Sequence, residues 1–162
     1  MNNIYNLYKN KKTIIICSII IVCYIILLCY EMWKYAIPHN FECNNIIISQ
    51  EKVYKNYLDN VKKTRSKLLI DGWVVNTTHP VTHFYVKILL KSKNKSYLIN
   101  TNSVQREDVE KLVKQNRIGV HSSGFVGNII HLFMKKDTYN IYIIFYDNDK
   151  KVIIDTGNKI KI

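Results

Sequence analysis

Two histidines four residues apart, His79 and His83, are the first candidates for chemistry, because imidazole is a common metal ligand. Pro80 lies between them and a strand is predicted to start at His83, so the pair belongs to a loop rather than to one face of a helix. No cysteine or carboxylate lies close by in the sequence to complete the four ligands of a structural zinc site. We therefore predict that the chain binds no metal ion and no cofactor.

A group of acids, Glu107, Asp108 and Glu110, is the second candidate. Two carboxylates can act as acid and base on a glycosidic bond when a cleft holds them at a fixed separation. Acids at the start of a short helix more commonly cap that helix and interact with its dipole. We predict no catalytic residue and no enzymatic activity. The alternative is a cell-wall glycan hydrolase that uses these acids.

The segment from Gly119 to Gly124, GVHSSG, is superficially similar to the nucleophile elbow of hydrolases. Its spacing is not G-x-S-x-G, and no strand–turn–helix pattern surrounds it. We expect a loop that leads into a strand, with Gly124 in a backbone conformation that glycine adopts readily.

Tyrosine is abundant, with twelve residues, and alternating positions such as Tyr85 and Tyr142 are predicted to face outward from a sheet. Exposed aromatic rings beside lysine can stack on sugars or contact a protein partner. Amphipathic rings that half-cover a sheet face are the more common arrangement, so we assign no binding residue.

The chain is basic, with 24 Lys+Arg against 12 Asp+Glu and a formal charge of +12. Such a surface attracts an anionic wall polymer or lipid headgroups in a salt-sensitive way. Lysine far outnumbers arginine, which argues against a surface that reads phosphates or bases, and A/T-rich codons would produce the same excess of Lys, Ile and Asn. We predict no nucleic-acid partner. A hydrophobic content of 48% excludes wholesale disorder.

The elements that must position these residues begin with an apolar segment, TIIICSIIIVCYIILLCY, at residues 13–30. It contains no charge, proline or glycine, and as a helix it would span about 27 Å, close to the thickness of a bilayer's hydrocarbon core. We predict a transmembrane helix that contacts the lipid bilayer through residues 13–30. Cys17, Cys23 and Cys29 are read as small apolar residues of this span.

The charges that flank the span predict its orientation. Lys9, Lys11 and Lys12 precede it without an acid, so residues 1–12 are expected in the cytoplasm and the C-terminal part outside it. The predicted location is the plasma membrane, with a single pass. A secreted factor whose N-terminal segment is cleaved is the alternative, but the apolar run is longer than the usual signal-peptide core and no clean small-x-small site follows.

Residues 31–66 are predicted to be a juxtamembrane linker that contains an amphipathic helix at 51–63. Val53, Tyr57 and Val61 recur there at steps of four, with Tyr54 and Leu58 beside them. Cys43 is the single cysteine outside the span, so the outer domain must fold without an internal disulfide. A free thiol and a link to another chain both stay open for it.

From residue 67 to 162 the hydrophobic pattern changes to the period of two that is typical of strands. Strands are predicted over 68–75, 83–91, 96–100, 125–132, 139–146, 152–155 and 159–162, with a short helix over 106–115 and a turn at 156–158. Seven short strands and one short helix favour an antiparallel β-sandwich of immunoglobulin-like architecture. The fold class is therefore mainly β, behind an N-terminal transmembrane helix.

This part of the chain also resembles the small Ig-like β-sandwich domains of bacterial envelope and cell-surface proteins. The residues that carry the resemblance are Gly72-Trp73, Arg106-x-Asp108-Val109, Ser123-Gly124-Phe125 and Tyr139. The resemblance implies the fold and an envelope location, and it implies no catalytic residues. We expect an interaction or structural role, either binding a wall glycopolymer or serving as an accessory subunit of a membrane complex.

Overall fold

The computed structural model describes residues 2–41, 53–78, 84–113, 123–147 and 150–162. The chain divides into two compact units, Met1–Tyr35 and Ala36–Ile162. Each is described by itself, and the second is called the β unit below.

The first unit is formed by one long helix, α1, which runs from Asn2 to Ala36. Its segment Lys11–Trp33 is long and apolar enough to cross a membrane, by length and composition, and a signal sequence passes the same test. The side chains of residues 11–33 are exposed, as expected for a helix without a polar stripe that has no protein core to pack against. Cys17, Cys23 and Cys29 are free thiols, and Cys43 lies outside the described residues.

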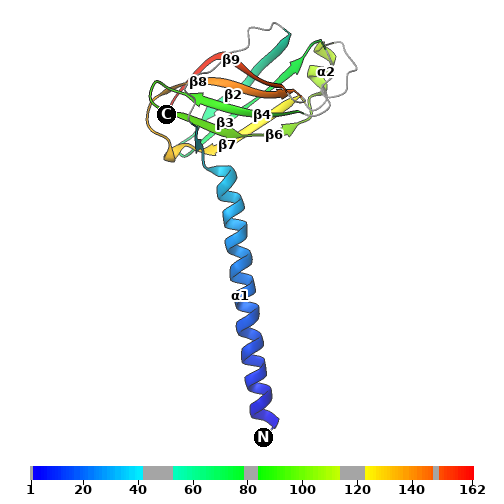
Figure 1. Ribbon diagram of the computed structural model, residues 1–162, viewed down its shortest axis with the longest axis vertical. Helices are drawn as coiled ribbons and strands as arrows, with labels where there is room; N and C mark the ends of the chain where they lie inside the picture. The colour runs from blue at the N-terminus through cyan, green and yellow to red at the C-terminus, as the bar shows by residue number, and fades with distance from the viewer. Residues whose placement is uncertain (1, 42–52, 79–83, 114–122, 148–149) are drawn as a thin grey trace. The chain divides into compact units, whose positions relative to one another are not determined.

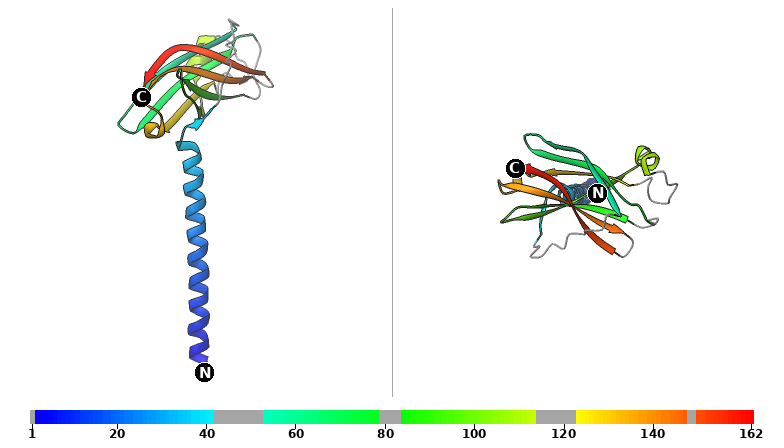
Figure 2. Two further views of the ribbon diagram at one scale, coloured as in Figure 1. Left: turned by 60° about the vertical axis from the view of Figure 1, so that its left-hand side comes forward. Right: turned by 90° about the horizontal axis from the view of Figure 1, so that it is seen from above.

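The β unit consists of two antiparallel sheets (Figure 1). The five-stranded sheet has the order β1-β5-β4-β8-β9, and its strands are β1 (His39–Asn40), β5 (Ser96–Asn100), β4 (Phe84–Lys91), β8 (Thr138–Asp147) and β9 (Lys150–Lys161). The four-stranded sheet has the order β2-β3-β7-β6, with β2 (Tyr54–Lys63), β3 (Lys67–Asn76), β7 (Gly124–Ile130) and β6 (Asn102–Val104). Helix α2 (Glu107–Val113) and the short 3-10 helix η1 (His131–Phe133) complete it, and Figure 2 shows α2 at the end of the unit opposite the C-terminus.

One hydrophobic core draws on both sheets. Alternate residues of the longer inner strands are buried, among them Leu68 and Ile70 of β3, Ile88 of β4, Phe125 of β7 and Ile143 of β8. On the other face of the five-stranded sheet, Leu89 and Ile144 are also buried, so the central strands β4 and β8 are covered on both faces. This explains why their sequences read as nearly continuous apolar runs.

The prediction of a mainly β fold with one apolar N-terminal helix is confirmed, but the described residues form nine strands rather than seven. Strands β4, β5, β7 and β8 and helix α2 lie where the alternation predicted them. A turn at 92–95 joins β4 to β5, and in it the Ser92 hydroxyl accepts a hydrogen bond from the backbone N–H of Lys95. Three observed strands were not predicted: β2, and the short edge strands β1 and β6, which are two and three residues long and carry no periodic signal. The two strands predicted at 152–155 and 159–162 are one strand, β9.

The prediction of an amphipathic helix at 51–63 is wrong, because Tyr54–Lys63 forms strand β2. Tyr54 and Leu58 face the core on one side of a β-bulge, and Val61 faces it on the other. The bulge at Asp59 shifts the alternation by one residue, so the inward positions fall at spacings of four and three, which is the signature of a helix. Tyr57, predicted to lie on the apolar face, is 61% exposed.

The predicted turn at 156–158 is also absent, because β9 runs through it without a break. Gly157 has φ +70 and lies where the register between β8 and β9 is interrupted. The pairing stops at Tyr142 opposite Asp155 and resumes with Asn140 opposite Lys159. The glycine therefore allows a local irregularity within one strand rather than a reversal of the chain. Gly124 lies in β7, and Gly157 is the glycine with a positive φ among the described residues.

Candidate functional site

A groove of about 440 Å³ lies on the face of the four-stranded sheet that is turned away from the shared core. Strand alternation places Leu69 and Asp71 of β3 on this face, while Leu68 and Ile70 face the core. The lining residues come from all four strands and the turn before α2: Asn60, Leu69, Asp71, Gly72, Val104, Arg106, Phe125 and Val126. The floor is mostly apolar, with three polar side chains around it.

The guanidinium of Arg106 is the centre of the polar part. Its Nε donates to Oδ1 of Asp108 at 2.8 Å and one terminal nitrogen donates to Oδ2 at 2.6 Å, which makes a bidentate pair. The other terminal nitrogen donates to the carboxylate of Asp59. Arg106 follows β6 and Asp59 belongs to β2, so this side chain connects the two edge strands of the sheet.

Local features of two strands allow Arg106 to reach across. Asp59 is the extra residue of the β2 bulge and has no register partner on β3. Gly124 of β7 lies beneath the arginine, and a Cβ at this position would be 2.6 Å from Cγ of Arg106. Gly124 is therefore required for the close approach of a side chain. The backbone conformation predicted for it is not found.

The charges of the site are unequal. The hydrogen bonds from Arg106 lower the pKa of Asp108 to about 2, and the bonds to Asp108 and Asp59 raise the pKa of Arg106. One guanidinium is paired with the carboxylates of Asp59 and Asp108, and the carboxylate of Asp71 lines the same groove, so the formal charge of these four side chains is 1 − 3 = −2. A neutral or cationic ligand fits this groove better than an anion does.

Asp71 and Asn60 are opposite each other in the register of β3 and β2 and form the second polar element. The Asn60 amide donates to Oδ2 of Asp71 at 3.0 Å, while Oδ1 of Asp71 is buried without a hydrogen-bond partner. A guanidinium has five N–H donors, and the bonds to Asp59 and Asp108 use three of them. The remaining N–H groups of Arg106 and the second N–H and the oxygen of Asn60 can bond a polar ligand such as a hydroxyl.

Aromatic side chains border the same face. Tyr57 lies opposite Trp73 in the register of β2 and β3, and Tyr57 is largely exposed. Trp73 packs against the pair Val75 and Val109, which fixes α2 on this sheet. An exposed tyrosine beside charged and amide groups is a combination that suits ligands with both apolar faces and hydroxyls.

The structure separates the predicted candidates. Among the acids of α2, Asp108 is bound to Arg106, whereas Glu107 is exposed and not part of the groove. His79 and His83, like residues 119–122, lie outside the described residues, and no group of three His, Cys, Asp or Glu side chains in the described part could hold a metal ion. Tyr85 is exposed as predicted and stacks on Tyr146, with ring centroids 4.0 Å apart, and Tyr142 is half-buried.

Sequence reasoning assigned no role to Asp59, Asn60 or Arg106. Asp108 is one of the predicted candidate acids, whereas Arg106 enters only through the motif Arg106-x-Asp108-Val109, and the structure shows that the two residues form a bidentate ion pair. One available signal was an isolated arginine within a lysine-rich chain, since arginine is preferred where two hydrogen bonds must form in one plane.

No protein-family model, no curated protein and no solved structure gives a significant match to this chain. The resemblance to envelope domains stays a prediction.

Proposed function

We propose that this chain is a single-pass membrane protein that presents an Ig-like β-sandwich outside the cytoplasm and binds a polar glycan segment in the groove. The apolar segment Lys11–Trp33 supports the anchor, and the lysines that precede it support a cytoplasmic N-terminus. The single core to which both antiparallel sheets contribute supports the sandwich. Its role is interaction or structure at the cell envelope.

The observation that carries the binding proposal is the grouping of Arg106, Asn60 and Asp71 around one groove. These side chains offer donors and acceptors above an apolar floor, and exposed Tyr57 lies on the same face. Binding sites for small polar ligands combine an apolar lining with a few placed polar groups in this way. Because the formal charge of the groove is negative, an uncharged stretch of a wall glycopolymer suits it. The anionic groups of the same polymer suit the lysine-rich surfaces elsewhere on the β unit.

The ionisation of Asp108 favours binding over hydrolysis. A general acid in glycoside hydrolysis needs a raised pKa so that it holds a proton at neutral pH. The pKa of Asp108 is lowered to about 2, so this carboxyl group is ionised and bound to Arg106. In the alternative hydrolase that uses the acids of 107–110, Asp108 is therefore unsuited to be the proton donor.

Isothermal titration of the full chain in detergent micelles tests the groove. The probes are an uncharged N-acetylglucosamine oligomer and an anionic poly(glycerol phosphate). We expect the uncharged oligomer to bind the wild type and to lose about tenfold in affinity with Asn60→Ala, the size expected when one ligand hydrogen bond is removed.

Asn128→Ala is the matched control, since Asn128 is exposed on β7 but does not line the groove. It should bind like the wild type. Equal losses in both variants, or no binding of the uncharged oligomer, would refute the glycan site.

The anchor has its own test. Under this proposal the chain stays in the membrane pellet after an alkaline carbonate wash and keeps its full mass of 19.2 kDa. A shorter mature chain that begins after the apolar segment would support the alternative, a secreted factor with a cleaved N-terminal segment.

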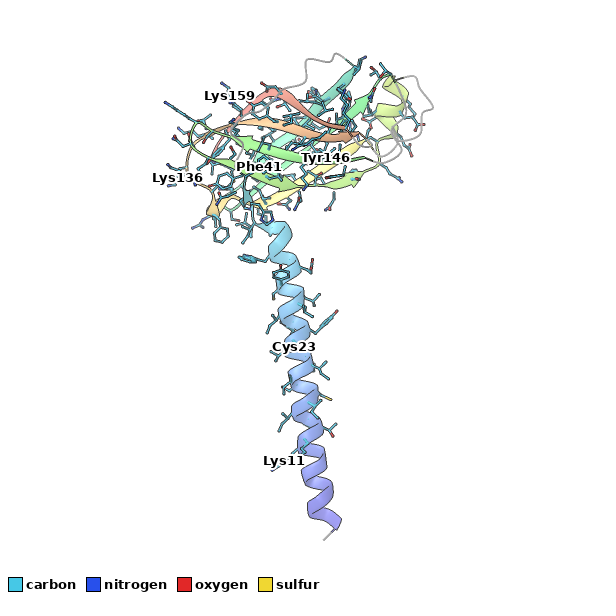
Figure 3. All side chains as sticks on the ribbon, viewed as in Figure 1. Lys11, Cys23, Phe41, Lys136, Tyr146 and Lys159 are labelled. Atoms are coloured by element: carbon cyan, nitrogen blue, oxygen red, sulfur yellow. The ribbon has the colours of Figure 1, made fainter. Side chains whose placement is uncertain are left out.

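The stacked pair Tyr85 and Tyr146 favours a second candidate, an accessory subunit of a membrane complex. Tyr85 is exposed, and Nζ of Lys87 lies 5.7 Å from its ring centre (Figure 3 labels Tyr146). Exposed aromatic residues of this kind are enriched where proteins bind one another. Affinity capture from solubilised membranes should then recover a partner that Tyr85→Ala loses and Asn128→Ala keeps.

A further inference from the structure

Basic side chains gather at one end of the β unit, where β2, β4, β7 and β9 end and β3, β5 and β8 begin. All of them are exposed: Lys62, Lys63, Arg65, Lys67, Lys93, Lys95, Lys135, Lys136, Lys159 and Lys161. We call this surface the basic end, and Figure 3 labels Lys136 and Lys159 on it. Asp137 is the one side-chain carboxylate that the described residues place there, and none of these described cations is in an ion pair.

Several bonds hold the basic end together as one surface. Nζ of Lys63 donates to the carbonyl oxygen of Lys161 at 2.7 Å, which links the end of β2 to the end of β9. The backbone N–H of Lys135 donates to the Tyr97 hydroxyl, and that of Ile162 donates to the carbonyl oxygen of Asp137. Figures 1 and 2 accordingly show the turn after β7 beside the C-terminus in every view.

Two apolar side chains project from the middle of this surface. Leu132 and Phe133, in η1, are each 63% exposed. The preceding residue, His131, is buried, and Nε2 of its ring lies 3.0 Å from the carbonyl oxygen of Thr64. The backbone N–H of His131 donates to the carbonyl oxygen of Ser66. The turn is therefore fixed at His131, while no described residue covers the side chains of Leu132 and Phe133.

After α1 the chain runs along β1 toward this same end. Helix α1 ends at Ala36, and after two residues β1 begins, with Asn40 opposite Tyr97 and His39 opposite Leu98 near the start of β5. The N–H of Phe41 donates to the carbonyl oxygen of Ser96, beside the lysine-rich turn of β4 and β5. If α1 crosses a bilayer, only a few residues separate the basic end from the lipid surface.

We propose that the basic end rests on the anionic headgroup surface of the membrane that holds α1, with Leu132 and Phe133 inserted into the interfacial layer. This inference rests on the proposed membrane anchor. Lysine side chains are attracted to phosphate groups over a distance of about 10 Å at 0.1 M salt. Two residues separate the end of α1 from the start of β1, so the connection is short in sequence. Apolar side chains surrounded by cations are the pattern of segments that lie in the membrane interface.

Hydrogen–deuterium exchange of the full chain in lipid nanodiscs tests the proposal. One set of discs contains phosphatidylcholine alone, and the other contains an equal mixture of phosphatidylcholine and phosphatidylglycerol. We expect the amides of 131–136 and 63–67 to exchange several-fold more slowly in the anionic discs, and high salt should weaken this protection.

Two variants are compared with a control of equal charge. Leu132→Ser with Phe133→Ser, and Lys135→Glu with Lys136→Glu, should each remove the protection, and both change exposed side chains. Lys55→Glu with Lys111→Glu alters the net charge by the same amount, on exposed residues away from the basic end, and should leave the protection unchanged.

The outcomes separate this inference from the proposed anchor. If the chain does not enter the nanodiscs, the anchor is wrong. If it enters them but both kinds of disc give the same exchange, or the control variant loses protection equally, the basic end does not bind lipid. Equal protection by soluble poly(glycerol phosphate) without lipid would assign this surface to a polymer and overturn the proposal.

Discussion

Arg106 and Asp59 are 47 residues apart in the sequence, and their ion pair joins the two edge strands of the four-stranded sheet. Arg106 reaches over Gly124, and Asp59 is turned toward it by the bulge in β2. The arginine side chain is only 20% exposed, so its bonds are shielded from water more than those of an ordinary surface pair. The site described above depends on this connection.

Arg106→Ala should therefore destabilise the β unit by about 1–2 kcal/mol, because it removes three charged hydrogen bonds that are only partly exposed. Urea unfolding followed by circular dichroism measures the loss. Arg65→Ala is the control, since Arg65 is exposed in the β2–β3 turn, and it should change the stability by less than about 0.5 kcal/mol. Equal effects of the two substitutions would contradict a special role for Arg106.

The Arg106–Asp108 pair predicts a defined response to acid. The pKa of Asp108 is about 2 in the folded chain, against 3.8 for the free group, so the folded state favours the ionised form. The stability from this pair is complete above about pH 4 and is lost as the pH falls toward 2.

Melting temperatures measured from pH 5 to pH 2 should thus fall less steeply for Asp108→Asn than for the wild type. Glu107→Gln removes a neighbouring exposed carboxylate that is not bound to Arg106 and should keep the wild-type slope. Parallel curves for Asp108→Asn and the wild type would refute the assignment.

Gly124→Ala should be destabilising, because the added Cβ would lie 2.6 Å from Cγ of Arg106 and 2.7 Å from the carbonyl oxygen of Val104. We expect a loss of about 1–3 kcal/mol, as for other substitutions that force atoms into a filled site. Combining it with Arg106→Ala removes the first of these two contacts, so the double variant should lose less than the sum of the single ones. Strict additivity in urea unfolding would show that Arg106 does not cross over Gly124.

Tyr139 predicts a response to alkali. Its side chain is buried, and its hydroxyl donates to the carbonyl oxygen of Lys135 at 2.6 Å. Burial raises the pKa of Tyr139 to about 12 from 10.0, so its contribution to stability is complete below pH 10 and is lost as the pH rises through 12.

Tyr139→Phe should cost about 1 kcal/mol at neutral pH through the lost hydrogen bond, and should make unfolding less sensitive to pH between 10 and 12. Circular dichroism measures the stability and its dependence on pH. The absorbance of tyrosinate in the near ultraviolet measures the ionisation of the tyrosine side chains. Tyr57→Phe, at an exposed position, is the comparison and should alter neither quantity.

The strands that sequence reasoning found are those whose periodicity has no interruption. In β8, Tyr139, Ile141, Ile143 and Phe145 alternate toward the core, and the pattern is visible without coordinates. In β2 the bulge at Asp59 changes the period in mid-strand, and in β9 Gly157 imitates a turn. Both errors arise because inserted residues, one in β2 and two in β9, alter the spacing while the pairing continues on either side.

The site was harder to predict than the fold for a different reason. The bond between Arg106 and Asp59 depends on which strands are neighbours. The spacing of residues along the sequence does not predict the strand order β2-β3-β7-β6. The exposure of Leu132 and Phe133 is equally invisible, since the sequence continues the apolar pattern of β7 through them. Only the three-dimensional arrangement shows that η1 ends the strand and turns these two side chains outward.

Strand β1 has a mechanical consequence. It contributes two residues, His39 and Asn40, to an edge of a sheet whose other pairings are several times longer. A force applied to the N-terminal side of the chain acts first on this two-residue pairing. We expect β1 to separate from β5 before the longer strand pairings break. The pairing of β1 with β5 is thus expected to break under tension before the two sheets of the β unit unfold.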